Sequence, residues 1–490
     1  MRFLLYICAI LLFCVVKNNS LFAQSIPDGN LKNFSSNEDV LDHADQKMRE
    51  TLQELSYNPK LHPAHTDRET GQWVEEYLGR ERWTSGFFAG SMWYLYKLTG
   101  DPFWREHAVQ WTQDLESEAY NTSDHDTGFR ILNSFGNAYK IEEARYYFKT
   151  TLQGAATLAE RYDPEIGAIK SWEWVGNYPV IIDNLMNLEL LFWAAEVVGR
   201  DEWYDIALAH SETSLKHHLR ADGSTYHVVD FSDFGAVNWK NTFQGYNAES
   251  VWARGQAWAV YGFTMTYRFT REKKFLDAAK ASADYFIENL PEDFVPPYDF
   301  LEPEPSVRTK DASAAAITAS GLFELYTFTN NENYFNTAVE ILESLSSDAY
   351  MTKNSEISSI LKRSTRQRGQ GNLGTSYADY YFLESIVRYR ELTNANFPVI
   401  EKESIFFLDQ NYPNPFNNST VIYYSIEEEG EVDLSIYNLA GRKVQTLENR
   451  FRSVGTYRIN FNAFGLSSGV YLYRLKVNGR ASTKKMILVE

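Results

Sequence analysis

The spacing of apolar residues divides this chain into two parts. From about residue 37 to 393 they recur every three or four positions, as in "SMWYLYKLTG" and "LELLFWAAEVVGR", which predicts helices. After about residue 400 they alternate with polar residues in short runs between turn signals, as in "EVDLSIYN" and "GVYLYRLKV", which predicts strands. The pattern therefore predicts a large all-α domain followed by a small β-sandwich.

Twelve helices are expected in the first part. They lie near residues 37–57, 83–98, 102–118, 128–139, 142–161, 182–199, 202–218, 249–270, 272–290, 311–329, 332–347 and 375–393. Short turns follow the even-numbered helices, and longer loops rich in Gly, Trp, Tyr and Pro follow most odd-numbered ones. A weak repeat, seen in "YKLTGDPFWREHA" and "YRFTREKKFLDAA", supports a paired arrangement. Six helical hairpins closed into an (α/α)6 barrel fit this alternation, with the long loops and the site at one end.

The starts of the even-numbered helices carry unusual residues. They read "RWTSGFF", "HDTGF", "IIDNLMN", "ESVWARGQAW", "KDASAAA" and "SYADYYF". In a barrel all six point into one mouth, where helix N-termini favour an anionic ligand. Each Asp or Ser taken alone is also explained as a helix N-cap. The six together, with Trp and Arg among them, favour a site.

The N-terminus predicts export. A basic start at Arg2 precedes the apolar run "FLLYICAILLFCVV", and "LFAQS" then supplies a cleavage site, which predicts a signal peptide over residues 1–24. The run is too short for a comfortable membrane span, and we expect no integral membrane span elsewhere. Cys8 and Cys14 are the only cysteines, so the mature chain would lack disulfides, a thiol nucleophile and a cysteine zinc site. The helical domain is assigned to residues 25–398 and the β domain to residues 399–490.

The net charge of the protein bears on the kind of molecule that it binds. The formal net charge is −18 at pH 7, which argues against nucleic acid as a partner. An anionic substrate would therefore need a local cluster of positive groups. No His pair has metal-ligand spacing on a helix, and "GQGNLG" lacks the lysine of a phosphate-binding loop, so we expect no metal and no cofactor.

Two carboxylates are the main candidates for chemistry. Asp183 follows the apolar run "VII" and precedes an apolar helix, so we expect it to be partly buried. Burial raises the pKa of a carboxyl group and lets it donate a proton near neutrality. Asp126 in "HDTGF" is the second, and a carboxylate pair is the usual equipment of glycoside chemistry. Their spacing in sequence does not give their separation in space.

Other polar and aromatic residues surround these two. Arg254 in "SVWARGQAW" either pairs with a substrate carboxylate or bridges helices, and Trp252 can stack on a sugar. His125 either binds substrate or orients Asp126. His227 and Gln244 lie in loops, where a lone His is more often a satisfied polar residue than a catalyst.

The blocks of the helical domain resemble a known family. "RWTSGFFAG", "HDTGF", "YPVIIDNLMNLELLFWAA", "DGSTYHVVDF", "SVWARGQAWAVYGF", "DASAAAITASGL" and "YADYYFLES" resemble, in order over residues 80–393, the unsaturated glucuronyl hydrolases of glycoside hydrolase family 88. "RGQAW" favours them over the related unsaturated rhamnogalacturonyl hydrolases, where "RGNGW"-like sequences are usual. The resemblance implies an (α/α)6 barrel acting on an anionic oligosaccharide with a terminal 4,5-unsaturated uronate, left by a polysaccharide lyase.

The resemblance also implies roles. Asp183 matches the general acid/base that protonates C4 of the double bond before water adds at C5, a vinyl-ether hydration, and Asp126 matches the second essential aspartate. The positions that match substrate-binding residues are Trp83, His125, His227, Gln244, Trp252 and Arg254.

The polysaccharide stays open at this point. Ulvan, chondroitin, hyaluronan and heparin all yield suitable ends, and export fits a sulfated marine source such as ulvan. The basic loop "LKRSTRQRGQGN", with Lys362, Arg363, Arg366 and Arg368, either contacts sulfate or a second uronate or is a solvated loop.

The last segment resembles another family. "FLDQNYPNPFNNSTVIYYSI", "VDLSIYNLAGRKV" and "GVYLYRLKVNGRASTKKMILV" resemble the C-terminal sorting domain of the type IX secretion system over about residues 405–490. The resemblance implies that the type IX secretion machinery carries the protein across the outer membrane to the cell surface or medium, after export into the periplasm by the signal peptide. The alternative is an accessory carbohydrate-binding sandwich.

Two functions of other classes compete. A polysaccharide lyase on the same scaffold would use His227 as base and Arg254 to neutralise the uronate, but it leaves Asp183 without a role. A non-catalytic surface glycan-binding protein leaves both mouth aspartates unexplained, because bare carboxylates repel an anionic glycan.

Overall fold

The computed structural model describes residues 31–34, 37–76, 83–303, 309–353, 355–393, 397–398 and 406–489. The predicted signal peptide, with Cys8 and Cys14, lies outside these residues. The predicted domain boundary at 398/399 lies at the edge of a range that the structure does not describe. Within them, no helix combines the length and the apolar character needed to cross a bilayer.

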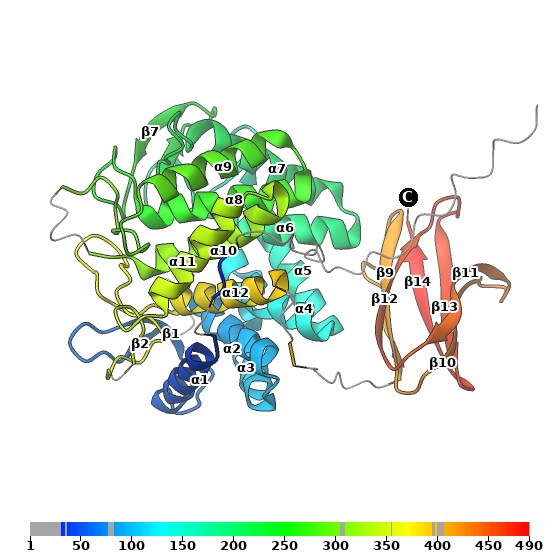
Figure 1. The fold of residues 1–490 in the computed structure, drawn as a ribbon. Coiled ribbons are helices and arrows are strands. Elements are labelled where there is room, and N and C mark those ends of the chain that lie inside the picture. Colours follow the sequence, from blue (N-terminus) through cyan, green and yellow to red (C-terminus); the bar gives the residue numbers. More distant parts are fainter. Residues whose placement is uncertain are drawn as a thin grey trace, which may run out of the picture.

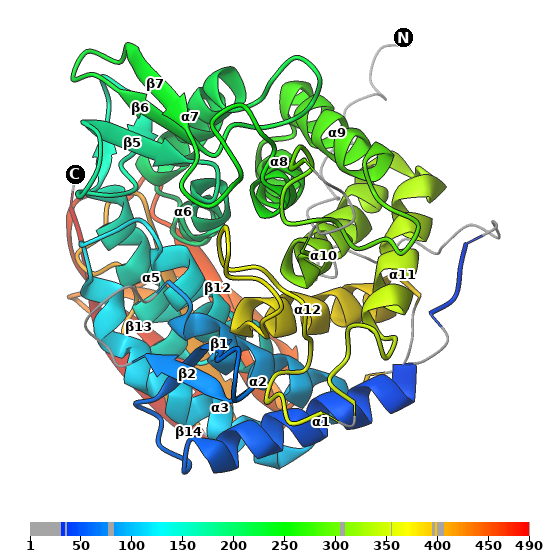
Figure 2. The same cartoon turned by 90° about the vertical axis from the view of Figure 1, so that its left-hand side faces the viewer.

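Twelve helical segments form a closed (α/α)6 barrel, as the spacing predicts (Figures 1 and 2). The inner ring consists of α2 (Ser85–Thr99), the π-helix η2 (Gly128–Gly136) continued by α4 (Asn137–Glu142), α6 (Asn184–Val198), α8 (Ala253–Thr270), α10 (Ala312–Thr329) and α12 (Ser376–Leu392). The outer ring consists of α1 (Asn37–Glu54), α3 (Pro102–Asp114) with the 3-10 helix η1 (Leu115–Tyr120), α5 (Arg145–Ala159), α7 (Asp201–His217), α9 (Lys273–Glu288) and α11 (Glu332–Leu345). Each inner helix packs on the next, and α12 packs on α2, which closes the ring.

Short turns join each of five inner helices to the outer helix that follows. Each turn has one residue in the left-handed region, with φ between 51° and 71°, whose N–H donates to the carbonyl four residues earlier. These residues are Gly100, Glu143, Gly199, Arg271 and Asn330. An extended residue follows and reverses the chain, so all five short turns lie at one end and the long loops at the other.

Glycine allows the inner helices to approach closely at the long-loop end. A Cβ atom on Gly86 would lie 2.2 Å from the carbonyl oxygen of Phe129, and one on Gly128 would lie 2.6 Å from Cα of Asn187. Neither contact is possible for a larger residue without a backbone shift. The starts of α2, η2 and α6 are therefore drawn together at the mouth.

The long loops contain short strands. A hairpin is formed by β1 (His62–Thr66) and β2 (Trp73–Glu76), and another by β3 (Tyr162–Asp163) and β4 (Ala168–Ile169). A three-stranded antiparallel sheet consists of β5 (Tyr178–Ile181), β6 (Val228–Phe231) and β7 (Val237–Asn241), and Figure 2 shows it at the open end of the barrel. In its register Ile181 pairs with Val228, so the residues that flank these two positions, Asp183 and His227, come together at the mouth.

The C-terminal part is a β-sandwich, as the alternation predicts. One sheet has the order β11 (Lys443–Arg452), β10 (Gly430–Asn438), β13 (Gly469–Val477), β14 (Arg480–Leu488), and the other β12 (Gly455–Asn462), β9 (Ser419–Ile426), β8 (Phe407–Leu408). Apolar side chains from both sheets form its core.

The sandwich packs beside α4, α5 and α6 (Figure 1). Asp409 accepts from Arg145 Nη1 at 2.9 Å, and Arg458 donates to the carbonyl of Val197 at 2.6 Å. Arg145 and Val197 flank short turns, so the sandwich is attached at the end of the barrel opposite the mouth.

Candidate active site

The structure distinguishes two aspartates that bind backbone N–H groups, Asp311 and Asp379, from Asp183. Asp311 accepts from the backbone N–H groups of Ser313 and Ala314 and caps α10. Asp379 accepts from the N–H groups of Ile360 and Leu361 and anchors the loop before α12. Asp183 occupies the N-cap position of α6, but its side chain makes no capping hydrogen bond. Its carboxyl group is therefore available for chemistry.

Asp183 is 8% exposed, in agreement with the apolar residues that frame it. Burial raises the pKa of Asp183 to about 7, although the charge of Arg254 and the indole of Trp258 act in the opposite direction. Its Oδ2 has no hydrogen-bond partner among the described residues. A half-protonated acid with an unpaired oxygen is suited to exchanging a proton with a ligand near neutral pH.

His227 faces this acid. Its Nε2 lies 3.7 Å from Asp183 Oδ2, and its ring lies against Trp252 with the ring centroids 4.5 Å apart. Burial lowers the pKa of His227 well below its ordinary value, so the ring is neutral. Its Nδ1 accepts from the N–H of Phe243 at 3.3 Å, which assigns the ring proton to Nε2. The imidazole therefore presents a neutral N–H donor beside the Asp183 carboxyl group.

Asp126 is the second carboxyl group of the cluster. Burial raises its pKa well above the ordinary value, and the charges of Asp124 and Asp183 act in the same direction. The influence of Asp183 means that the two candidate carboxyl groups are close enough to interact. His125 Nε2 lies 3.5 Å from Asp126 Oδ1, and burial lowers the pKa of His125 to about 3, so this His is also neutral.

Two residues that hold this cluster were not identified from the sequence. Arg130 is fully buried and binds Asp124 at 2.8 Å and Glu118 at 3.2 Å. Asn187 accepts from the N–H of Phe129 at 2.9 Å and thereby connects η2 to α6. Asn187 stands four positions after Asp183, on the same helix face, and that spacing is the signal in the sequence. For Arg130 the sequence offers only its proximity to Asp124.

The helix that follows Asp126 also differs from the expected one. The sequence predicts an α-helix over 128–139, whereas the structure has a π-helix at Gly128–Gly136 before α4. Such wide turns are rare and often occur at functional sites. The π-helix starts at Gly128, the residue that approaches Asn187 closely.

Arg254 is a bridge in this structure. The guanidinium is fully buried, and Nη1 donates to the carbonyl of Thr365 at 2.5 Å and lies 3.2 Å from Asp311. Nη2 donates to the carbonyl of Arg366 at 2.7 Å. This geometry matches the bridging alternative, because both terminal nitrogens are engaged by the protein. Direct pairing of Arg254 with a substrate carboxylate stays a prediction.

The remaining predicted residues lie around the same mouth. Trp83 packs against Tyr377, with ring centroids 4.8 Å apart, and against Phe129 at 5.5 Å, so it belongs to an aromatic wall. Gln244 donates to the carbonyl of Arg366 at 3.3 Å. Gln244 and Arg254 thus hold the same carbonyl group and bring the basic loop to the mouth.

The arginines of the basic loop contact different parts of the barrel. Arg363 lies over the ring of Tyr350, in the segment after α11, at 5.0 Å. Arg368 lies over the ring of Tyr246 at 4.7 Å and is exposed. Burial lowers the pKa of His65, and the charge of Arg366 acts in the same direction. Burial raises the pKa of Tyr377, and the charges of Arg254 and Arg366 oppose this rise, so the charge of Arg366 lies near the mouth.

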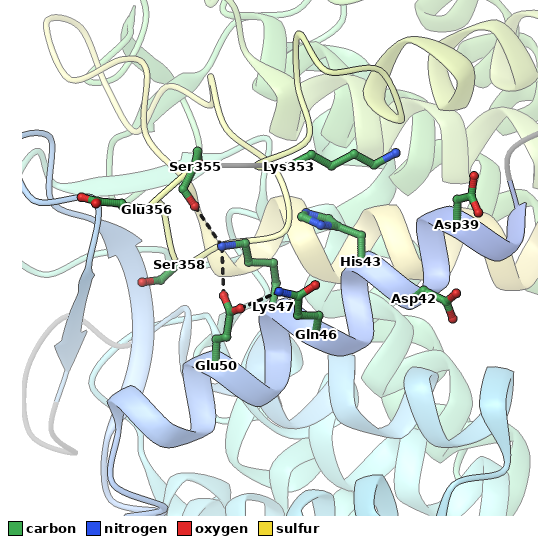
Figure 3. A pocket seen from close by; sticks show the side chains of 10 residues that line it. All are labelled: Asp39, Asp42, His43, Gln46, Lys47, Glu50, Lys353, Ser355, Glu356 and Ser358. Atoms are coloured by element: carbon green, nitrogen blue, oxygen red, sulfur yellow. Dashed lines mark hydrogen bonds and ion pairs between the residues drawn. The ribbon is translucent and has the colours of Figure 1, made fainter.

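A separate cavity of about 710 Å³ lies between α1 and a loop that contributes Lys353, Ser355, Glu356 and Ser358 (Figure 3). Two lysines, Lys47 and Lys353, line it, and Lys47 lies 3.0 Å from Glu50 and donates to the carbonyl of Ser355 at 3.2 Å. The cavity is formed by an outer helix and is distinct from the mouth. Over the residues that the structure covers, no group of three His, Cys, Asp or Glu residues could hold a metal ion.

Comparisons with known proteins agree with this geometry. A family model described as Glycosyl Hydrolase Family 88 matches residues 57–296, and one described as Secretion system C-terminal sorting domain matches residues 410–490. An unsaturated glucuronyl hydrolase of Formosa agariphila is 43% identical over 321 residues, covering 63% of this chain and 80% of that protein. An unsaturated chondroitin disaccharide hydrolase of Streptococcus pyogenes is 30% identical over 376 residues, covering 73% and 93%.

Solved structures give the same result. A crystal structure of an unsaturated glucuronyl hydrolase specific for heparin superposes with a TM-score of 0.69 at 36% identity, covering 72% of this chain and 98% of that one. The unsaturated glucuronyl hydrolase of Bacillus sp. GL1 superposes with a TM-score of 0.67 at 31% identity, covering 72% and 98%.

Proposed function

Because this chain belongs to the unsaturated glucuronyl hydrolases of glycoside hydrolase family 88, we propose that it removes a 4,5-unsaturated uronate from the non-reducing end of lyase-generated oligosaccharides. One observation carries the proposal. Asp183 is a buried, uncapped carboxyl group with a pKa of about 7 at the mouth of the barrel, and it faces a neutral His227. The enzyme is thereby classed as a glycoside hydrolase.

The proposed chemistry is hydration of a vinyl ether. Protonated Asp183 gives its proton to C4, the π electrons of the C4–C5 bond form the new C–H bond, and positive charge develops at C5 and the ring oxygen. Water then adds to C5, and the Asp183 carboxylate takes the proton that this water loses. The hemiketal opens: the C5 hydroxyl group loses its proton as C5 becomes a ketone, the bond between C5 and the ring oxygen breaks, and the ring oxygen takes a proton. The hemiacetal left at C1 then collapses to an aldehyde, its hydroxyl proton passes to the glycosidic oxygen, and the aglycone leaves as an alcohol.

Asp126 and His125 support the substrate in this proposal. Burial and the charges of Asp124 and Asp183 raise the pKa of Asp126, which favours the protonated carboxyl group, and in that form Asp126 can donate a hydrogen bond to a sugar hydroxyl group. Neutral His125 orients it from 3.5 Å. The Nε2–H of His227 lies beside the reacting acid and can donate to the substrate. Trp83 and Trp252 supply apolar surfaces for the sugar.

The uronate carboxylate needs positive potential in an acidic protein. The N-termini of η2, α6 and α8 meet at the mouth, and the charge of Arg254 reaches Asp183. We propose that Arg254 acts mainly through its field and by holding the carbonyl of Arg366, which Gln244 also binds. A direct contact would require the guanidinium to exchange a protein partner for the substrate.

We propose a sulfated or otherwise polyanionic glycan as the source, with ulvan as the first candidate. Arg366 and Arg368 lie by the mouth and can neutralise a sulfate or a second uronate on the aglycone. The proteins similar to this chain include ones named for chondroitin disaccharide and for heparin. The C-terminal sorting domain supports export by the type IX system, and we propose that the predicted signal peptide directs the preceding step.

The test follows the ultraviolet absorbance of the conjugated uronate. The protein is mixed with lyase-digested ulvan, chondroitin, hyaluronan and heparin, in parallel with Asp183→Asn and with Asp348→Asn, which changes an exposed aspartate after α11. Loss of absorbance with wild type and Asp348→Asn, but not with Asp183→Asn, supports the proposal, and the fastest substrate names the glycan. A rise in absorbance on intact polymer would indicate a lyase, and no change on any digest would overturn the proposal.

A further inference from the structure

Three aromatic residues, of which two are exposed and Trp172 is half-buried, form a surface beside the catalytic cluster. Trp172 and Trp174, in the segment between β4 and β5, stack with ring centroids 4.9 Å apart and an interplanar angle of 28°. Phe243, just after β7, meets them edge-on at 5.5 Å and 5.2 Å. Trp174 is 66% exposed and Phe243 is 38% exposed. We call these three residues the rim platform. Such exposure of stacked aromatic rings is characteristic of a binding surface rather than of a core.

The rim platform continues the catalytic site outward. The ring of Trp172 meets that of His227 edge-on, with centroids 6.1 Å apart, and His227 Nε2 lies 3.7 Å from Asp183 Oδ2. The rings of Trp174 and Phe243 in turn contact the ring of Trp172. Asp183, His227, Trp172 and Trp174 therefore form a continuous row from the buried acid to the solvent-exposed rim.

Two ion pairs hold the part of the segment that carries Trp172 and Trp174. Glu173, between the two Trp residues, lies 2.9 Å from Arg161 and 2.7 Å from Lys170. Arg161 also donates to the carbonyl of Thr122 at 2.5 Å, three residues before His125. The platform and the segment that carries Asp126 are thus fastened to the same guanidinium, which lowers the entropy lost on binding a ligand.

The residues after Trp174, from Gly176 to Tyr178, are held against β6. Asp230 on β6 accepts from the N–H groups of Asn177 and Tyr178 at 2.8 Å and 2.9 Å. Gly176 has φ of 66°, and a Cβ atom there would lie 2.3 Å from Asp230 Oδ1. Only glycine fits this position, so the backbone at Gly176 can lie directly against Asp230.

We propose that the rim platform binds the second and third sugar rings of the aglycone and makes the enzyme prefer longer unsaturated oligosaccharides to disaccharides. The proposal rests on the proposed function, because an enzyme that processes the terminal uronate at the buried acid must let the rest of the chain leave through the mouth. The row of rings lies along that exit. The apolar C–H faces of sugar rings pack on flat aromatic rings, and an indole offers the largest such surface.

The experiment compares oligosaccharide lengths. Unsaturated disaccharide and tetrasaccharide are prepared by lyase digestion of ulvan and, separately, of chondroitin, and kcat/KM is measured for wild type, Trp174→Ala and Phe243→Ala. Phe234→Ala is the matched control, because Phe234 is a 91% exposed aromatic residue on the turn between β6 and β7. We expect Trp174→Ala to lower kcat/KM for the tetrasaccharide by about tenfold, the size of one aromatic stacking contact, with about twofold or less for the disaccharide. Phe243→Ala should act in the same direction and Phe234→Ala on neither substrate.

Binding of both lengths to Asp183→Asn, alone and combined with Trp174→Ala, separates the platform from the reaction. Tetrasaccharide binding that weakens only when Trp174 is lost supports the platform even if no turnover is found, in which case the proposed function alone fails. Equal losses for both lengths would show that the segment merely supports the catalytic cluster. No loss for either length, or loss in Phe234→Ala as well, would also overturn the inference.

Discussion

Asp183→Asn should abolish turnover and yet stabilise the barrel at alkaline pH. Burial raises the pKa of Asp183 from 3.8 to about 7. At about 1.4 kcal/mol for each tenfold change, the native site favours the neutral acid over the carboxylate by roughly 4 kcal/mol. Asparagine has nearly the same shape and carries no charge at any pH, so it avoids this electrostatic penalty.

The sign follows from proton binding. Between pH 3.8 and about 7 the native protein keeps the Asp183 proton and the unfolded chain has lost it, so the free energy of unfolding falls as pH rises. Above about 7 both states are ionised and the full penalty is present. The stability of Asp183→Asn relative to wild type should therefore be near zero at about pH 4 and should rise by up to roughly 4 kcal/mol at about pH 8.

Urea unfolding followed by tryptophan fluorescence measures this difference. All twelve Trp residues lie between Trp73 and Trp258, so the signal reports on the barrel and not on the C-terminal sandwich. Asp348→Asn, at an exposed position, should run parallel to wild type at every pH. If Asp183→Asn is less stable than wild type at about pH 8, or if the difference does not grow with pH, then the acid is not held neutral and its role as proton donor loses its basis.

Four further predictions follow from the same contacts. Turnover needs protonated Asp183, so kcat/KM should fall about tenfold per pH unit above about pH 7; a profile that stays flat well above this pH would contradict the mechanism. Arg254→Lys removes the fork that binds Asp311 and two carbonyl groups, and should cost about 3 kcal/mol in urea unfolding; unchanged stability would show that the bridge is dispensable. Gly86→Ala drives a Cβ into the carbonyl of Phe129 and should destabilise the barrel by about 1–3 kcal/mol, and a wild-type unfolding midpoint would disprove this close approach. Dialysis against a chelator should leave activity unchanged, since the proposed steps use only side chains and water; loss restored by a divalent ion would refute that.

Much of the fold was readable from the sequence because its signals are local. Helical and strand periodicities each arise from neighbouring residues, and the switch near residue 400 separates them clearly. The alternation of short and long connections then predicted the closed ring of helices with one open end. The apolar residues around Asp183 likewise predicted its burial and raised pKa, because they adjoin it in the chain.

The roles of individual polar residues were not readable in this way. Asp183, Asp311 and Asp379 all lie near helix starts, but only the packed structure shows that the last two bind backbone N–H groups. Arg254 satisfied two hypotheses in the sequence, and its partners Thr365 and Arg366 lie more than a hundred positions away. The π-helix starts at a close approach between Gly128 and Asn187 of another helix, a contact that no local pattern reports.

The sequence by itself thus determined the classes of the two parts, the number of helices and the end of the barrel that carries the candidate chemistry. These follow from short-range periodicity and turn preference, which hardly depend on the rest of the chain. The tertiary structure decided which carboxyl group stays free and unpaired, and it brought Trp172 and Trp174 together with Phe243. Such features depend on burial and on distances between remote segments, and those quantities exist only once the ring of helices has closed.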